Sequence, residues 1–220
     1  MVEVKICGIT SLEDAVSAVS AGADALGFIF HAASPRSVTP DRVREISLQL
    51  PAKACRVGVF VDLGAEEVKR IFRFCRLDRI QLHGKESPEY CGLFSPAVLI
   101  KAVSIRKESD LFSLGQYPVK AVLVDAYDPL RPGGTGRTCD WRLARKAGEK
   151  HRIILAGGLN AGNVLAALEA VSPHAVDVGS GAEAHPGKKD PQKVKELIGL
   201  VKGAGELPGS PWRGSIFEPS

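Results

Sequence analysis

Short apolar, β-branched runs alternate with segments of helical periodicity from the start of this chain to about Leu200. The helical segments, such as Leu12–Val19, Arg42–Leu50 and Glu66–Cys75, repeat their apolar positions every three or four residues. The apolar runs lie at Val2–Cys7, Ala25–Phe30, Cys55–Val61, Arg79–Leu82, Val98–Val103, Ala121–Val124, Ile153–Ala156 and Ala175–Val178. Near-continuous apolar strands separated by helices are typical of a parallel sheet that is covered by helices.

Several of the predicted helices begin at a recognisable cap. Thr10 together with Glu13 fits a capping box. Three other starts place a capping side chain before a proline, at Thr39-Pro40, Ser87-Pro88 and Asp190-Pro191. These starts support the alternation of strands and helices.

Eight strand–helix units predict an α/β fold of the TIM (β/α)8-barrel type, as a single catalytic domain over residues 1–202. A chain of 220 residues leaves little room for two full domains. A doubly wound open sheet is the alternative, but it usually has fewer strands, and no G-x-G-x-x-G follows the first run. Residues 203–220 are rich in Gly, Pro and Ser, and we expect a poorly ordered or loosely packed tail outside the barrel.

Composition and charge narrow the possible functions. No stretch approaches the roughly 18 consecutive apolar residues of a membrane span, and Met1 leads straight into a strand without a leader segment, which predicts a cytoplasmic location. The net charge of +4 suits a small anionic substrate. No basic run with interleaved aromatic residues is present, so we expect neither a nucleic-acid partner nor a membrane partner.

The cysteines show neither a disulfide pattern nor a metal-binding pattern. The chain has 5 of them, an odd number, scattered and without a C-x-x-C pair. This pattern argues against a disulfide framework and against a structural zinc site.

Two segments carry the candidate chemistry. Lys5–Thr10 (KICGIT) and Val124–Trp141 each begin in an apolar run, reach a reactive side chain and then break into glycine. The reactive residues are Cys7 in the first segment and Asp125 in the second. Barrels present catalytic groups at the carboxyl ends of their strands, so a thiol and a carboxylate in these places suggest a base and an acid on either side of a small substrate.

Each of these two residues also has a simpler interpretation. A lone cysteine in an apolar strand usually packs as a small buried hydrophobe, but the neighbouring Gly8 and the nearby Lys5 favour a lowered thiol pKa for Cys7. Asp125 could merely cap a turn. Its place directly after Ala121–Val124 and before a long glycine-rich loop favours a catalytic carboxylate.

Two other side chains are candidates for substrate binding. Arg36, in Ser34–Ser37, is either a solvated loop arginine or a fork that grips a carboxylate. His83 follows the strand that ends at Leu82 and could hydrogen-bond to a sugar hydroxyl, although a lone histidine is a weak signal.

Glycine-rich turns follow the last two apolar runs. Glycines in these turns let backbone N–H groups approach an anion closely, and the loops after strands 7 and 8 are the recurrent phosphate site of this barrel. Tight turns alone could also explain the glycines, but two such turns at the two expected positions favour phosphate. The candidate phosphate-binding residues are Gly157, Gly158, Gly179, Ser180 and Gly181.

Taken together, these segments resemble one family. KICGIT, GADALGFIFHAASPRSV, QLHGKE, LVD followed by GGTGRTCDW, LAGGLNAGNV and VDVGSGAEAHPGKKD occur in the order seen in the phosphoribosylanthranilate isomerases of tryptophan biosynthesis, and they span Val2 to about Leu200. The resemblance implies a TIM barrel without a metal or an organic cofactor. It also implies an Amadori rearrangement of N-(5-phosphoribosyl)anthranilate to 1-(2-carboxyphenylamino)-1-deoxyribulose 5-phosphate.

The resemblance assigns roles to the candidate residues. Asp125 matches the general acid that protonates the ribose ring oxygen, and Cys7 matches the base that removes the C2′ proton. Arg36 corresponds to the group that holds the anthranilate carboxylate, and the glycine turns correspond to the phosphate site. Gly179 stands where the family commonly has serine. Asp177 corresponds to a group that contacts a ribose hydroxyl. Together with Lys5 and His83 it completes the expected set of substrate-binding residues.

Other interpretations remain at this stage. One is another phosphate-binding barrel lyase or synthase that acts on a related phosphosugar. Indole-glycerol-phosphate synthase would be expected to use lysine and glutamate at strand ends, where this chain has Cys7 and Asp125. Another is a barrel that binds a phosphorylated ligand without catalysis. Either a monomer or a homodimer is compatible with the sequence.

Overall fold

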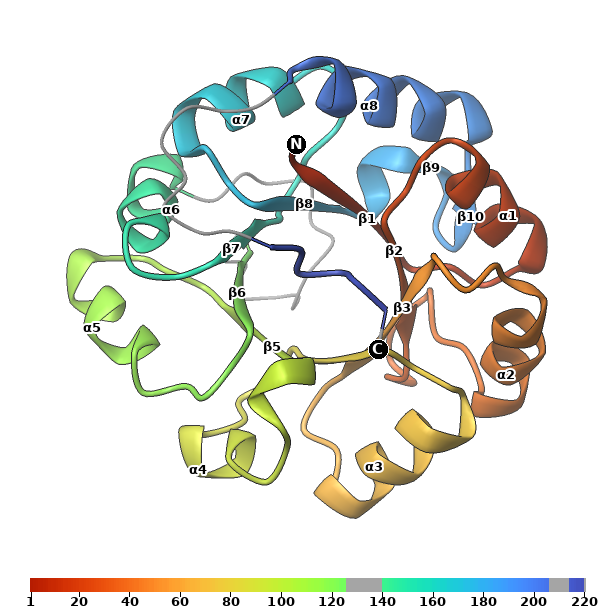
Figure 1. The fold of residues 1–220 in the computed structure, drawn as a ribbon, viewed down its shortest axis with the longest axis horizontal. Coiled ribbons are helices and arrows are strands. Elements are labelled where there is room, and N and C mark those ends of the chain that lie inside the picture. The colour runs from red at the N-terminus through yellow and green to blue at the C-terminus, as the bar shows by residue number, and fades with distance from the viewer. Residues whose placement is uncertain (126–139, 206–213, 220) are drawn as a thin grey trace.

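Eight parallel strands close into a barrel in the computed structural model, which describes residues 1–125, 140–205 and 214–219 (Figure 1). Each strand pairs with the next one along the chain, and β1 pairs with β8 to close the ring. The strands are β1 (Glu3–Cys7), β2 (Ala25–Ile29), β3 (Cys55–Phe60), β4 (Arg79–Leu82), β5 (Leu99–Val103), β6 (Ala121–Val124), β7 (Ile153–Leu155) and β8 (Ala175–Val178). The predicted barrel is confirmed, and the open-sheet alternative is wrong.

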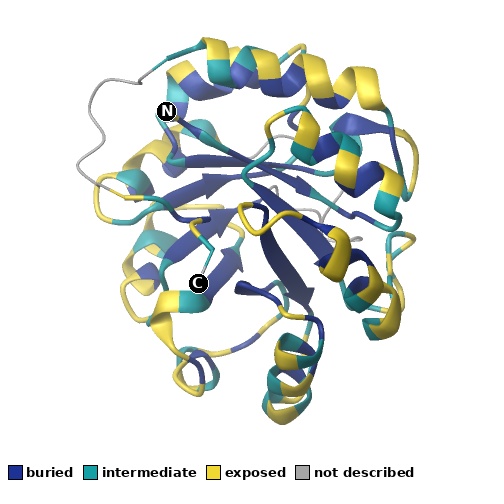
Figure 2. Ribbon diagram, turned by 45° about the vertical axis from the view of Figure 1, so that its right-hand side comes forward, coloured by how far each residue is buried: buried dark blue, intermediate teal, exposed yellow. Residues whose placement is uncertain are grey.

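Helices surround this barrel and keep their apolar sides on the strands, so that buried residues line the inside and exposed residues the rim (Figure 2). The helices are α1 (Leu12–Ser20), α2 (Pro40–Gln49), α3 (Ala65–Phe74), α4 (Pro88–Cys91), α5 (Leu111–Leu114), α6 (Trp141–Gly148), α7 (Val164–Val171) and α8 (Pro191–Gly203). Short 3-10 turns lie at η1 (Pro96–Val98), η2 (Glu108–Asp110) and η3 (Ser180–Ala182), and β9 (Glu183–His185) pairs with β10 (Lys188–Lys189) after β8. None of the described helices combines the length and apolarity needed to cross a membrane.

The helix caps follow the sequence in three cases out of the four predicted. Thr39, Ser87 and Asp190 each accept a hydrogen bond from the first turn of the helix that follows. Thr10 is not a cap. Ser11 caps α1 through the N–H of Asp14 at 3.1 Å, while the Thr10 hydroxyl donates to the carbonyl of Gly187 at 2.6 Å. Thr10 therefore ties the β1 loop to the β9–β10 ribbon.

The strands bury one set of side chains against the helices and the other set around the barrel axis. On β1, Val4 and Ile6 belong to the outer core, whereas Lys5 and Cys7 alternate with them on the inner side. The apolar cluster along the axis comprises Ala25, Cys55, Val57, Ile100, Ala102, Ala121, Leu123, Ile154, Ala156 and Ala175, together with Ile216 and Phe217. Many of its strand residues are alanine, so the strands alone would leave the axis underfilled.

The last described residues fill the amino-terminal end of the barrel. Ile216 and Phe217 are 0% and 2% exposed. The Glu3 carboxylate accepts the N–H groups of Ile216 and Phe217 at 2.8 and 3.3 Å, and Arg79 donates to the Ile216 carbonyl at 3.0 Å. Figure 1 shows this terminal segment, in dark blue, across the opening of the ring. A loosely packed segment outside the barrel is therefore wrong for residues 214–219, because this apolar pair is too short to show periodicity.

We expect Phe217→Ala to lower the free energy of unfolding by about 3–5 kcal/mol, because it removes a buried aromatic ring from a close-packed axis. Phe112→Ala is the matched control, since that phenylalanine is 84% exposed, and we expect a change within about 0.5 kcal/mol. Urea denaturation of both variants measures the difference. Equal stabilities would show that the terminal segment does not contribute to the core.

Candidate active site

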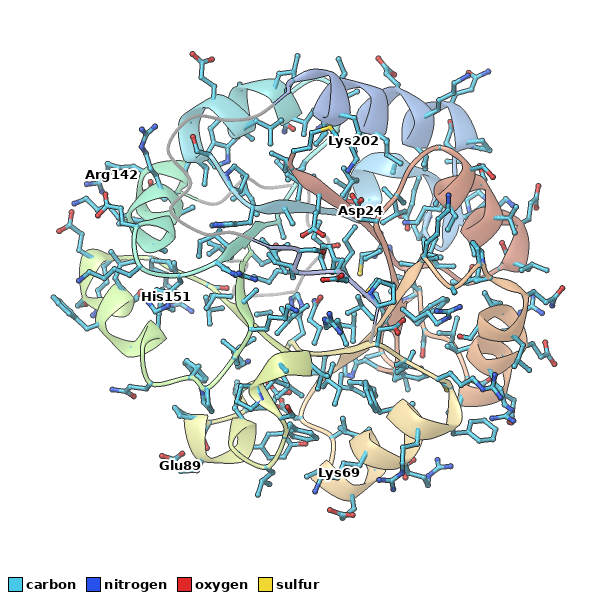
Figure 3. The ribbon with its side chains drawn as sticks, in the orientation of Figure 1. Asp24, Lys69, Glu89, Arg142, His151 and Lys202 are labelled. Atoms are coloured by element: carbon cyan, nitrogen blue, oxygen red, sulfur yellow. The ribbon has the colours of Figure 1, made fainter. Side chains whose placement is uncertain are left out.

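Charged side chains and a thiol gather on the inner side of the barrel toward the carboxyl ends of the strands. Lys5 and Cys7 come from β1, Asp177 comes from β8, and Asp125 directly follows β6. Charged side chains of the surrounding helices, such as the labelled Arg142, lie instead at the rim of the molecule (Figure 3). The thiol and the carboxylate that the sequence singles out thus belong to the same end of the barrel.

Lys5, Asp177 and Cys7 form a tight cluster. The Lys5 ammonium lies 2.8 Å from Asp177 Oδ1, and these side chains are 0% and 8% exposed. A Cβ atom on Gly27 of β2 would lie 2.8 Å from Cys7 Sγ and 3.0 Å from Lys5 Nζ. Only glycine therefore leaves space for both side chains. Gly27 was not predicted from the sequence as part of the site, although a glycine inside an apolar strand often marks a place where other groups lie close to the backbone.

The pKa of the Cys7 thiol shifts in the direction opposite to the one expected from the sequence. Burial raises the pKa of the Cys7 thiol and Asp177 raises it further, while Lys5 and Lys189 act in the opposite direction without overcoming them. The expected lowering of the thiol pKa is therefore wrong for this structure, because desolvation outweighs the nearby cations. For Lys5, burial alone would lower the pKa of the ammonium, but Asp177 and Cys7 outweigh it and raise that pKa.

Lys5 thus remains a cation beneath the thiol. Its ammonium is fully buried and already bonded to Asp177. That position suits an electrostatic effect on Cys7, and direct contact of Lys5 with a substrate stays a prediction.

Asp125 is oriented by His83 and Gln81. His83 Nε2 lies 3.2 Å from Asp125 Oδ2, and the side-chain amide nitrogen of Gln81 lies 2.9 Å from His83 Nδ1. Gln81 thus contacts Nδ1 and Asp125 contacts Nε2, one on each side of the ring. Both ring nitrogens of His83 are therefore engaged with protein groups. The predicted contact of His83 with a sugar hydroxyl stays a prediction.

A cavity of about 1250 Å3 opens beside Asp125 and His83. Its other walls include Asp62 after β3, Lys101 within β5 and Ser104 after β5. The glycine-rich loop that the sequence places directly after Asp125 falls in residues 126–139, outside the described residues. The described walls of the cavity include no residue of β1, β2 or the two glycine turns, so the cavity borders the acid candidate but not Cys7 or Arg36.

Arg36 forms an ion pair with a carboxylate that was not predicted from the sequence. Its Nε and Nη2 atoms each lie 2.7 Å from a carboxylate oxygen of Glu183, at the start of β9. Lys189 of β10 also donates to Glu183, at 3.0 Å. Both missed residues lie in the VDVGSGAEAHPGKKD segment, where charged residues follow a glycine turn. The pairing of Glu183 with Arg36 bridges 147 residues of sequence and could not be read from spacing.

The two glycine turns lie against each other. Gly157 and Gly158 have φ values of +87° and +63°, which favour glycine, and a Cβ atom on Gly181 would lie 1.9 Å from the Leu159 carbonyl oxygen. Among the described residues, no hydrogen bond outside the regular strands and helices uses the N–H of Gly157, Gly158 or Gly179. These donors can therefore meet an anion. Ser180 begins η3 in the second turn.

The described residues hold no cluster of three or more His, Cys, Asp or Glu side chains that could bind a metal ion. A thiol and a carboxyl group at this end of the barrel can each take up or release a proton. Cationic and N–H groups nearby can hold an anionic substrate.

Comparison with known proteins identifies the relatives of this chain. Residues 4–199 match the family described as N-(5'-phosphoribosyl)anthranilate (PRA) isomerase. The isomerase of that name from Syntrophus aciditrophicus is 48% identical over 202 residues, which are 92% of this chain and 88% of the relative. The enzyme from Pelobacter propionicus is 50% identical, with 92% of this chain and 96% of the relative covered.

Solved structures give the same result. Phosphoribosylanthranilate isomerase from Thermotoga maritima superposes with a TM-score of 0.86 at 42% identity, covering 92% of this chain and 100% of that one. A further structure of such an isomerase, in complex with reduced 1-(o-carboxyphenylamino)-1-deoxyribulose 5-phosphate, has a TM-score of 0.82 at 41% identity, with 92% and 100% covered.

The closed ring of eight parallel strands defines a protein of the TIM-barrel class. The chain belongs to the N-(5'-phosphoribosyl)anthranilate isomerase family, and it is an isomerase of tryptophan biosynthesis. The resemblance read from the sequence is confirmed.

Proposed function

We propose that this enzyme converts N-(5-phosphoribosyl)anthranilate to 1-(2-carboxyphenylamino)-1-deoxyribulose 5-phosphate by an Amadori rearrangement, with Cys7 as general base and Asp125 as general acid. The observation that carries the proposal is the placement of a thiol on the last residue of β1 and a carboxyl group directly after β6, at one end of the barrel. The relative that binds the reduced form of this product supports the same substrate class.

The reaction begins with the acid. Asp125 gives its proton to the ring oxygen of the ribose, the bond from C1′ to that oxygen breaks, and a Schiff base forms between C1′ and the anthranilate nitrogen. His83 holds one carboxyl oxygen of Asp125 at 3.2 Å and thereby directs the group. Asp125 is left as a carboxylate.

The base completes the rearrangement. The Cys7 thiolate takes the proton from C2′, and the electrons of that bond move toward the Schiff base to give an enolamine. The enolamine then tautomerises to the C2′ ketone. Because the overall reaction is an isomerisation, the substrate gains and loses equal numbers of protons, and a final transfer returns Cys7 and Asp125 to their starting forms.

Cys7 must lose its proton before it can act, yet its pKa is raised in this structure. The proposal needs Cys7 as a thiolate, a form that Lys5 and Lys189 favour because both lower the thiol pKa against the effect of burial and Asp177. Lys5 thus serves the base in this proposal, whereas Asp177 opposes the thiolate.

The two anionic ends of the substrate are held by different groups. Arg36 binds the anthranilate carboxylate, and the turns at Gly157-Gly158 and Gly179–Gly181 bind the phosphate through backbone N–H groups. Asp177 serves a ribose hydroxyl. The substrate then spans the mouth of the barrel between β2 and the β7–β8 loops.

The test of this function is the decay of anthranilate-type fluorescence when purified protein meets freshly prepared phosphoribosylanthranilate. We expect rapid decay and formation of the ketone product, identified by chemical reduction of its ketone because substrate and product are isomers of equal mass. A barrel that only binds the substrate would leave the rate of decay at the spontaneous level.

For Arg36→Lys we expect KM to rise about tenfold while kcat falls less, because a point charge replaces a fork that fits a carboxylate. Steady-state kinetics on the pure variant give both constants. Arg42→Lys is the matched control: that arginine pairs with Glu45 on the surface of α2, and its replacement leaves KM unchanged. An unchanged KM in Arg36→Lys removes Arg36 from the substrate site.

A further inference from the structure

We propose that Glu183 is a positioning residue, which holds Arg36 in the one orientation that binds the carboxylate of the substrate. The inference rests on the proposed function of Arg36 and adds the group that aligns it. Glu183 touches neither of the candidate proton-transfer groups, so its effect on the reaction passes through Arg36.

The contact between the two side chains selects one edge of the guanidinium. Arg36 Nε and Nη2 donate to Oε1 and Oε2 of Glu183, each at 2.7 Å. The side chains are 14% and 4% exposed, so the pair is largely shielded from water. The edge that carries Nε and Nη2 is already bonded to Glu183 and cannot bind a second carboxylate. Nη1 makes no hydrogen bond within the described parts of the chain, so the edge that carries it is left for the substrate.

The stem of Arg36 is held as well. A Cβ atom on Gly8 would lie 2.6 Å from Arg36 Cδ and 3.4 Å from its Cβ and Cγ. The aliphatic part of Arg36 therefore lies directly over the backbone that follows Cys7. Gly8 also has a φ of +80°, which favours glycine. Arg36 is thus fixed at its stem by Gly8 and at its head by Glu183.

Glu183 is itself anchored and cannot follow Arg36 away from this position. Lys189 Nζ donates to Glu183 Oε1 at 3.0 Å and to the Gly179 carbonyl at 3.1 Å. The Lys189 side chain is 1% exposed. The anchor therefore joins Glu183 to one of the turns proposed to bind phosphate. Two cations and one anion leave a net positive charge where the substrate is anionic.

A fixed guanidinium matters because arginine has several rotatable bonds. A free Arg36 would lose that freedom on binding, and the loss would weaken affinity for the carboxylate. Because Glu183 already holds Arg36 in the folded protein, the side chain loses this freedom on folding and not on substrate binding. The effect falls on substrate binding and not on proton transfer, so it belongs in KM.

The experiment compares Glu183→Gln with wild type on two substrates. One is phosphoribosylanthranilate and the other is the aniline analogue, N-(5-phosphoribosyl)aniline, which lacks the carboxylate. We expect Glu183→Gln to raise KM for the first about tenfold with kcat within about threefold. For the aniline analogue we expect the same kinetic constants as wild type. The control, Asp78→Asn, breaks the Arg56 pair at the other end of the barrel and leaves both substrates unaffected.

The outcomes separate this inference from the proposed function. If Arg36→Lys raises KM but Glu183→Gln does not, the positioning role is overturned and the function of Arg36 stands. If Arg36→Lys leaves KM unchanged, the carboxylate site itself is wrong. A KM that rises equally for both substrates indicates general damage and also overturns the inference. Should Glu183→Gln not fold, Glu183→Asp keeps the charge with a shorter reach, and we expect the same selective loss for the carboxylated substrate.

Discussion

Asp125→Asn is expected to lower kcat by about a hundredfold or more, the usual scale for a positioned general acid, which corresponds to about 2.7 kcal/mol of transition-state stabilisation. Asparagine has nearly the same shape, and its amide oxygen can still accept the hydrogen bond from His83 that now lies at 3.2 Å. Substrate binding and folding therefore survive. Only the proton for the ribose ring oxygen is lost, so ring opening then depends on water.

The loss should appear in kcat and in kcat/KM together, because an acid acts on the transition state more than on the bound substrate. Asp24→Asn is the matched control. Asp24 pairs with Lys202 at 2.6 Å near the amino-terminal end of the strands, so its replacement tests the loss of a charged pair far from the site. Circular dichroism checks the fold of both. A folded Asp125→Asn enzyme within a few-fold of wild-type kcat would remove Asp125 as the acid.

Cys7→Ser is expected to keep the fold and to lose most turnover, by about a hundredfold or more, because a hydroxyl is a far weaker base than a thiolate near neutral pH. The serine side chain fits the space that Gly27 leaves beside Lys5. The raised pKa of Cys7 makes the thiolate a minor form, but a serine alkoxide is rarer still.

Cys75→Ser is the matched control, because Cys75 packs in the hydrophobic core and has no proposed part in the reaction. Cys75 is buried in the outer core, burial raises its pKa to about 11, and its thiol donates to the Pro40 carbonyl at 3.3 Å, a bond that serine can make. We expect this variant to keep its kcat. Near wild-type kcat in Cys7→Ser as well would assign the thiol to packing.

The strand–helix alternation could be predicted because each strand is buried on both sides and reads as an apolar run. Arg79–Leu82, Ala121–Val124 and Ala175–Val178 agree with the structure residue for residue. The terminal segment could not be predicted. Its place depends on the alanine-lined axis, which exists only after eight distant strands have closed, and on Glu3 and Arg79 at the amino ends of two of them.

At the site, the sequence indicates which residue types end the strands but not their surroundings. The nearby Lys5 favoured a lowered pKa for Cys7, yet burial and Asp177 raise it, and neither is visible in the local sequence. The Arg36–Glu183 pair likewise joins loops after β2 and β8, two strands that both flank β1 in the barrel. Such pairs depend on barrel closure and not on spacing along the chain.

The roles of Cys7 and Asp125 are tested most directly by the kinetic isotope effect on kcat with phosphoribosylanthranilate deuterated at C2′. In Cys7→Ser, removal of the C2′ proton becomes the slow step, and we predict a full primary isotope effect. In Asp125→Asn, ring opening is slow and the C2′ bond is not yet broken, so we predict kcat to be the same for both isotopes. A primary effect in Asp125→Asn together with none in Cys7→Ser would contradict the assignment of acid and base.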